Sequence, residues 1–316
     1  MDDETNARLT LAAFVAVVLI LGTNFVAVRF SNKELAPFWG AGLRFGGASL
    51  LLFAAAGLRR LPVPRGRALL GALIFGVLAF GGSYALVYWG MVRVPAGLAS
   101  VVMASTPLIT FVLALLQRQE PFRWRELLGG LVALLGMTVM FAGHIGAGVP
   151  LISLLSVTAG AGFFAEAGIL VKEFPRGHPI ATNAIAMGVG TAILLSASLL
   201  AREPHIVPRY TSTWVALAYL VIFGSSTAYV LYLFVLKRWP ASVTAFQFVL
   251  FPLVAISLGA WLAHEPVTRP LIAGAVLVLV GVYAGAVVPH RVGHPHKLGS
   301  EPSQGLIHHE ILARDP

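Results

Sequence analysis

Charged side chains are almost absent from the long apolar stretches of this 316-residue chain, with two exceptions. Arg44 and Glu166 are the charged residues that lie well inside such stretches. A buried guanidinium can hold an anion or bond nearby carbonyl groups, and a desolvated carboxyl group can exchange a proton near neutral pH. The two positions therefore indicate solute binding for Arg44 and proton carriage for Glu166.

A structural contact is the alternative for each. Arg44 would then snorkel towards the membrane face or bond the first helix, with Asn24 as its partner. At 1.5 Å per residue, Arg44 lies roughly 9 Å below one membrane face, and Glu166 lies at a similar depth from the other. We therefore expect two polar layers rather than a direct ion pair. The residues expected in the layer of Arg44 are Asn24, Tyr84, Tyr88 and Trp89, and those expected in the layer of Glu166 are Tyr229 and Gln247.

Aromatic and hydroxyl side chains complete the predicted site. Tyr84 and Tyr88 share one helical face, so they wall a cavity for a partly apolar solute or serve as ordinary packing. Pro107 and Pro252 lie mid-span, where proline kinks a helix and frees carbonyl groups, and we expect them to be hinges. The predicted cavity residues are Asn24, Arg44, Tyr84, Tyr88, Ser105, Thr106, Phe163, Glu166, Tyr229 and Gln247.

Motifs of several other protein classes are missing from the sequence. No cysteine, no HExxH and no stretch with two buried carboxylates is present, so neither a metal site nor a membrane-embedded enzyme is expected. The phosphate-binding Gly-x-x-x-x-Gly-Lys loop is also absent, and we expect no cofactor. The net charge is +9, but no basic run is interleaved with aromatic residues, so no nucleic-acid partner is expected.

The composition requires lipid as the main solvent. Apolar residues make up 58% of the chain and charged residues 11%, and the mean hydropathy is +0.84. Stretches of about 20 apolar residues are long enough to cross a bilayer as helices. The ten predicted spans are 9–28, 38–57, 68–90, 95–116, 126–143, 150–171, 179–200, 213–236, 241–263 and 269–288.

A set of markers occurs twice in the sequence with a constant offset of 145 residues. Pro95, Pro107, Glu120-Pro121, Gly129 and Gly136 recur as Pro240, Pro252, Glu265-Pro266, Gly274 and Gly281, and Tyr84 recurs as Tyr229. Because each copy holds five spans, the second copy must enter the membrane from the opposite side. Inverted repeats of this kind suit a carrier, and duplication retained for folding alone is the alternative. The two Glu-Pro glutamates are expected in loops, where they cap helices or pair across the surface.

Lys and Arg predict the orientation of the chain. If the N-terminus is cytoplasmic, 15 of the 22 basic residues fall on the cytoplasmic side and six outside, so both termini are expected inside. The first apolar run is too long for a signal peptide. We therefore expect a cytoplasmic N-terminus at 1–8, five-helix repeats at 9–143 and 150–288, and a disordered cytoplasmic tail at 289–316.

The stretch from Tyr84 to Glu120, with Pro95-Ala96, Pro107 and Glu120-Pro121, resembles the paired EamA domains of the drug/metabolite transporter superfamily. The sequence Leu21-Gly-Thr-Asn24-Phe and Arg44 are similar to that family's first domain. The resemblance covers about residues 9–288 and implies ten helices around a central cavity and the export of metabolites, amino acids or drugs. One departure is Leu21, where many members have tryptophan.

These observations predict an all-α integral membrane protein with ten transmembrane helices in two inverted five-helix repeats around a central cavity. We expect a secondary transporter of the inner or plasma membrane, proton-coupled or facilitative, acting as a monomer or weak dimer. Because Arg44 is the single basic side chain deep in a span, neutral, zwitterionic or weakly cationic solutes are favoured. An exchanger or uptake carrier and a membrane-embedded enzyme are the alternatives.

Overall fold

The fold is described from a computed structural model over residues 2–117, 124–142, 148–175, 177–236, 238–239 and 241–284. Every regular element in these ranges is a helix, as the lipid environment requires. The Glu120-Pro121 motif and the predicted tail at 289–316 lie outside the described residues.

Seven helical stretches within the described ranges are long and apolar enough to cross a membrane. They are Asn6–Ser31, Pro37–Leu58, Arg67–Met91, Ala96–Leu113, Leu151–Leu170, Pro179–Leu200 and Thr211–Tyr232. Shorter apolar helical stretches occupy Leu128–Met140, Leu250–Leu262 and Arg269–Gly281, where three further spans were expected. The chain is therefore an all-helical, multi-pass membrane protein.

The helices of the first half follow the predicted spans but differ at their ends and interruptions. They are α1 (Asp2–Ser31), α2 (Pro37–Leu58), α3 (Arg67–Phe75), the π-helix η1 (Gly76–Ser83), α4 (Tyr84–Met91), α5 (Ala96–Ala104), α6 (Thr106–Leu116) and α7 (Trp124–Ala142). The first helix already begins at Asp2, before the expected span.

The second half has a similar order of elements. They are α8 (Leu151–Leu170), the short 3₁₀ turn η3 (Val171–Glu173), α9 (Pro179–Leu200), α10 (Thr211–Val221), the π-helix η4 (Ile222–Thr227), α11 (Ala228–Leu236), α12 (Ala241–Leu262) and α13 (Arg269–Val282). Thr268 caps α13 by accepting a hydrogen bond from the Leu271 N–H. Proline in the first turn of α9 and α13 costs no helical hydrogen bond.

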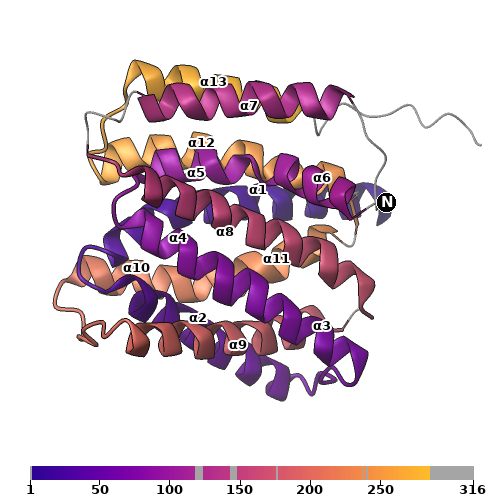
Figure 1. Ribbon diagram of the computed structural model, residues 1–316. Coiled ribbons are helices and arrows are strands. Elements are labelled where there is room, and N and C mark those ends of the chain that lie inside the picture. The colour runs from indigo at the N-terminus through magenta and orange to yellow at the C-terminus, as the bar shows by residue number, and fades with distance from the viewer. Residues whose placement is uncertain are drawn as a thin grey trace, which may run out of the picture.

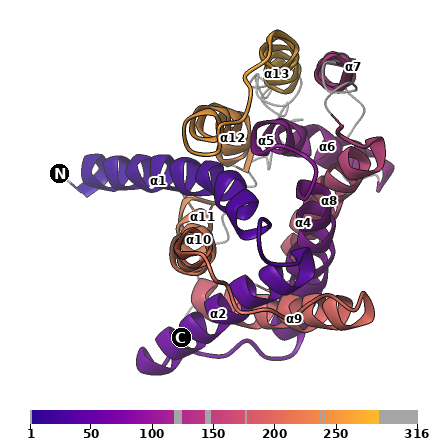
Figure 2. The ribbon, with the colours of Figure 1, turned by 90° about the vertical axis from the view of Figure 1, so that its left-hand side faces the viewer.

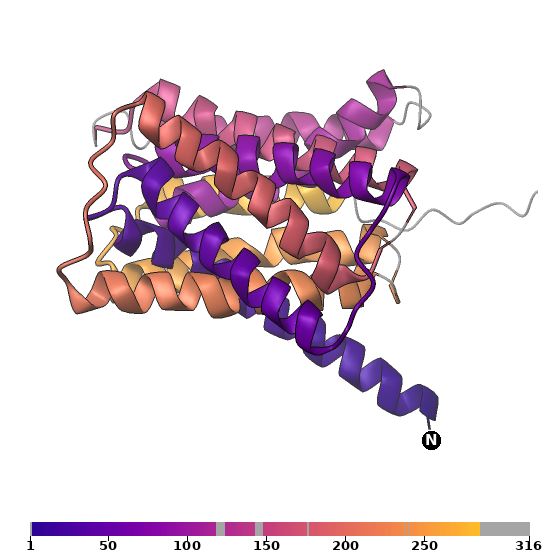
Figure 3. The ribbon, with the colours of Figure 1, turned by 90° about the horizontal axis from the view of Figure 1, so that it is seen from below.

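The helices form layers, with α7 and α13 on one side of the bundle and α2 and α9 on the opposite side (Figures 1 and 2). Glycines let α7 and α13 approach closely. A Cβ atom on Gly136 would lie 2.7 Å from the carbonyl oxygen of Gly274, and one on Gly274 would lie 2.6 Å from that of Gly136. Small residues at such crossings hold membrane helices together by close packing. The first part of α1 projects away from the bundle (Figure 3).

Two spans that were predicted as uninterrupted helices contain π-helical turns. The turns η1 and η4 each continue α-helices on both sides. A π-turn shifts the hydrogen-bond ladder by one residue, turns carbonyl groups away from their usual partners, and often marks a functional site. Hydrophobic periodicity carries no signal for this shift, which is why the sequence did not predict it.

The fourth predicted span is also interrupted, because α5 ends at Ala104 and α6 starts at Thr106. Pro107 has no N–H with which to bond the carbonyl of Met103. The hydroxyl of Thr106 donates to that carbonyl instead, and the Ser105 hydroxyl donates to Val102. Pro252 lies inside the continuous helix α12. The helix is thus interrupted at Pro107 and continuous at Pro252. The hinge role of both prolines stays a prediction.

Three glutamates bind the starts of helices that are remote in the sequence. Glu265 accepts from the Ala96 and Gly97 N–H groups of α5 at 2.9 and 3.3 Å, and one of its oxygens lies 3.4 Å from the Arg29 Nε. Glu203 accepts from Phe38 and Trp39 of α2, and Glu34 accepts from the residues that precede α10. Carboxylates suit helix N-termini because unpaired N–H groups and the helix dipole meet there. The expected capping and pairing role of Glu265 is confirmed.

The contacts of Glu34 are expected to stabilise the folded protein in a way that depends on pH. Desolvation opposes its ionisation, but hydrogen bonds donated by the backbone N–H groups of Arg209 and Tyr210 outweigh it and lower the pKa of Glu34 below 4.5. The ionised form is thus favoured by folding, so the contribution is present above pH 4.5 and is lost as the pH falls below it. We expect Glu34→Gln to lower the melting temperature more at pH 7 than at pH 3. An equal loss at both pH values would contradict this.

Candidate functional site

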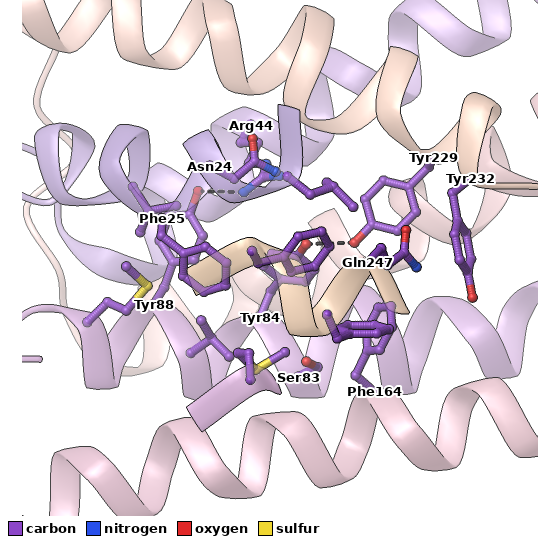
Figure 4. Close-up of a pocket in the computed structure, with 17 residues that line it drawn as sticks. Asn24, Phe25, Arg44, Ser83, Tyr84, Tyr88, Phe164, Tyr229, Tyr232 and Gln247 are labelled. Carbon is purple, nitrogen blue, oxygen red and sulfur yellow. Dashed lines mark hydrogen bonds between the residues drawn. The ribbon is translucent and has the colours of Figure 1, made fainter. Parts of the chain in front are cut away.

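A cavity lies between helices from both halves of the chain (Figure 4). Its lining is mainly apolar and aromatic, with a few polar groups. The lining residues are Leu21, Asn24, Phe25, Val28, Arg44, Ser83, Tyr84, Val87, Tyr88, Met91, Met103, Phe164, Tyr229, Tyr232, Gln247, Phe248 and Phe251.

Arg44 is the charged residue of the cavity lining, and it is completely buried. Its Nε donates to the Ser225 hydroxyl at 2.8 Å, one terminal nitrogen donates to the Gly224 carbonyl at 2.9 Å, and the other donates to the Tyr88 hydroxyl at 3.3 Å. The guanidinium carbon lies 4.8 Å from the ring centre of Phe45, which holds it by a cation–π contact. All these partners are neutral.

Asn24 and Arg44 share one acceptor instead of bonding each other. The Nδ2 of Asn24 donates to the Gly224 carbonyl at 3.0 Å, the same oxygen that Arg44 bonds. Gly224 belongs to η4, where the π-turn makes its carbonyl accessible. The predicted proximity of Asn24 to Arg44 is thus present, with a backbone carbonyl between them.

Tyr84 and Tyr229 meet inside the cavity, and their hydroxyl oxygens are 2.6 Å apart (Figure 4). They are the two tyrosines that occupy corresponding places in the repeat, 145 residues apart. Phe80 packs against both rings, with centroid distances of 6.2 and 5.0 Å. The pair and its aromatic surroundings form one wall of the cavity, in which one tyrosine hydroxyl donates a hydrogen bond to the other.

Four predicted site residues lie away from the cavity lining. The Ser105 and Thr106 hydroxyls bond the carbonyls of the preceding turn. Phe163 is 42% exposed, and its neighbour Phe164 takes the place in the cavity. Glu166 accepts a hydrogen bond from the Gln117 side chain at 2.7 Å. The six other predicted residues, Asn24, Arg44, Tyr84, Tyr88, Tyr229 and Gln247, line the cavity together.

The residues predicted from the sequence were polar or selected aromatic ones, so the apolar lining residues were not predicted. Their helical spacing from a predicted polar residue would have indicated them. Leu21, Phe25 and Val28 lie three or four residues from Asn24 or next to it, and all of them line the cavity. The partners of Arg44 in η4 could not be found in this way, because one of them is a backbone carbonyl.

The geometry suits reversible binding of a solute with an apolar body and a polar end. Within the described ranges, no group of three or more His, Cys, Asp or Glu side chains is arranged to hold a metal ion. Membrane-length helices around an amphipathic cavity define the class of membrane transporters.

The chain belongs to the EamA-like transporter family, whose model matches it twice, at residues 8–142 and 149–284. The predicted family resemblance is thereby confirmed. Relatives of this family are named as transporters or efflux pumps, so the alternative of a membrane-embedded enzyme is wrong.

Three named relatives illustrate the similarity. An uncharacterized inner membrane transporter, YedA, from Escherichia coli K12 is 28% identical, over 86% of this chain and 90% of its own length. A probable amino-acid metabolite efflux pump from Salmonella typhimurium is 28% identical, over 84% and 91%. A probable terminal-alkyne amino-acid exporter from Streptantibioticus cattleyicolor is 29% identical, over 85% and 91%.

A solved crystal structure has a similar fold. It matches with a TM-score of 0.63 at 18% identity, over 88% of this chain and 96% of that chain. At this identity the likeness concerns the fold alone.

Proposed function

We propose that this protein is a secondary transporter of the inner membrane that exports small amphipathic metabolites, with amino acids as the leading class. The observation that carries the proposal is the cavity, in which a buried arginine and an asparagine stand beside an aromatic wall. Relatives named as amino-acid exporters support the direction and the class of solute.

The proposed mechanism is alternating access between two inverted five-helix repeats. Support comes from contacts that the repeat relates to each other. Tyr84 bonds its counterpart Tyr229, and the close approach of Gly136 to Gly274 has its equivalent in that of Gly281 to Gly129. The π-turns η1 and η4 also fall at corresponding places. Two like halves around a cavity can exchange conformations, which would open the cavity to one side and then to the other. Pro107 and Pro252 are proposed as the hinges of this exchange.

Both termini are proposed to be cytoplasmic. The 15 basic residues that would then lie inside, against six outside, support this orientation. Under it, Glu34, Glu203 and Glu265 bind helix starts on the outer side of the membrane, and Glu166 lies towards the inner side.

Solute counterflow in proteoliposomes tests the proposal. Vesicles containing the purified protein are loaded with one unlabelled amino acid, and uptake of the same labelled amino acid is followed for a panel that includes phenylalanine, leucine and methionine. We expect saturable, protein-dependent counterflow for at least one solute. Absence of counterflow for the whole panel in correctly folded protein would contradict the proposal. Accumulation by right-side-out but not inside-out vesicles would favour the uptake alternative.

Proton coupling is tested in the same vesicles with an internal pH dye. If Glu166 carries the coupling proton, Glu166→Gln should abolish stoichiometric proton movement while counterflow persists. Gln117→Leu, which removes the side chain that bonds Glu166, is the matched control and should retain proton movement. Proton movement that survives Glu166→Gln would assign this residue a structural role.

A further inference from the structure

The positive charge of Arg44 is not neutralised within the described part of the chain. Its three hydrogen bonds go to a hydroxyl, a carbonyl and a phenol, and no carboxylate in the described ranges forms an ion pair with it. A buried charge without an opposite charge is costly, and a guanidinium has five N–H donors, of which these bonds use three. Arg44 therefore retains both charge and hydrogen-bonding capacity at the cavity wall.

Four glutamates of the described part of the chain have other partners. Glu34, Glu203 and Glu265 bind helix starts, and Glu166 binds Gln117. None of the four contacts Arg44, whose hydrogen bonds go to Ser225, Tyr88 and Gly224, so these glutamates do not supply its counter-ion. An anionic group on a bound solute is the natural partner for Arg44.

Next to Arg44, Asn24 offers a hydrogen-bond acceptor rather than a donor. A carbonyl oxygen can only accept, so the atom of Asn24 that bonds Gly224 must be its amide nitrogen. The Oδ1 of Asn24 is then a buried acceptor without a partner, on a side chain that is 7% exposed and lines the cavity. A Cβ on residue 224 would lie 2.3 Å from this oxygen, so glycine there leaves it room.

We propose that Arg44 and Asn24 form a subsite for the two charged groups of an α-amino acid with a large apolar side chain. Arg44 binds the carboxylate, and the Oδ1 of Asn24 accepts from the ammonium group. The apolar side chain lies against the phenylalanine rings that line the cavity, those of Phe25, Phe164, Phe248 and Phe251. This assignment rests on the proposed transport function and separates zwitterions from the weakly cationic solutes that the sequence also allowed.

Substrate analogues separate the two halves of the subsite. Binding to the purified protein in nanodiscs is measured by thermal shift with L-phenylalanine, L-phenylalaninamide, which lacks the carboxylate, and 3-phenylpropanoate, which lacks the ammonium group. Leucine and methionine with their amides extend the panel. We expect each amide to bind at least about tenfold more weakly than its amino acid, a difference of about 1.4 kcal/mol.

Two variants give crossed results that a merely structural role would not produce. Arg44→Gln should reduce the preference for phenylalanine over its amide and keep the preference over 3-phenylpropanoate. Asn24→Ala should do the reverse. Arg29→Gln is the matched control, because Arg29 bonds the Met91 and Val92 carbonyls and does not line the cavity, so both preferences should remain.

Each outcome decides the assignment. Equal binding of amino acid and amide to the wild-type protein would overturn it, and this comparison needs no variant to fold. No binding of any amino acid in the panel would also overturn it. Saturable counterflow of a solute without a carboxylate would leave transport standing and refute the subsite. Selective binding without any flux would support the subsite and contradict transport.

Discussion

Replacing Gly136 with valine is expected to cost about 3 kcal/mol of folding free energy, at the upper end of overpacking effects. Its Cβ would lie 2.7 Å from both the Gly274 carbonyl oxygen and the Val278 nitrogen, and backbone atoms cannot move aside as a flexible side chain can. The helices α7 and α13 would have to separate, and their close packing would be lost. Thermal unfolding followed by size-exclusion chromatography in detergent measures the loss.

The control for this experiment lies on the same helix. Gly130 has nothing within 4 Å of an added Cβ, so Gly130→Val introduces the same β-branched residue into α7 without the clash. Gly274→Val should match Gly136→Val, and the double variant should lose less than the sum, because both substitutions separate the same pair of helices. Equal melting temperatures for the Gly130 and Gly136 variants would show that this contact is unimportant.

Met103→Trp is expected to reduce counterflow by roughly tenfold or more, which corresponds to about 1.4 kcal/mol. Met103 lines the cavity from α5, and the larger indole would occupy space that the solute needs. The enclosing wall of Tyr84, Tyr229 and Phe80 is held by ring contacts and a hydrogen bond, so it cannot readily yield. Initial rates over a range of solute concentrations measure the effect.

A tryptophan on the lipid-facing surface is the control. Leu50 on α2 is 72% exposed in the bundle, and Leu50→Trp should transport normally. Both variants should retain the melting temperature of the parent protein within a few degrees. Normal flux through the Met103 variant would place the solute route elsewhere.

Most of the helical architecture was predictable because the apolar composition of the chain indicates that lipid surrounds it. Uninterrupted apolar runs must become helices in lipid, so α2 and α9 begin and end close to the predicted bounds. The π-turns were not predictable, since a one-residue shift in hydrogen bonding leaves no compositional trace. The start of α6 was only partly predictable: Pro107 indicated a disturbance, but neighbouring helices decide whether such a helix bends or stops.

Site residues were predictable where a polar or charged side chain lies inside an apolar membrane span. Arg44 and Asn24 were found because polar groups in a membrane span require a reason, and both line the cavity. Glu166 satisfied the same criterion, yet its partner is Gln117, just after the end of α6, a contact that no sequence spacing predicts. The choice between Phe163 and Phe164 depends on the rotation of α8, which a hydrophobic stretch with a weak polar face does not specify.

The glutamates that bind remote helix starts have a consequence for biogenesis. The starts of α2 and α5 in the first half are bound by Glu203 and Glu265, which are synthesised more than 160 residues later, and the start of α10 is bound by Glu34 of the first half. During insertion, the early helices therefore lack these carboxylate partners until the later loops emerge from the ribosome. Each half thus depends on the other for the carboxylates that bind some of its helix starts. The folded protein can therefore form completely only after both halves have been synthesised.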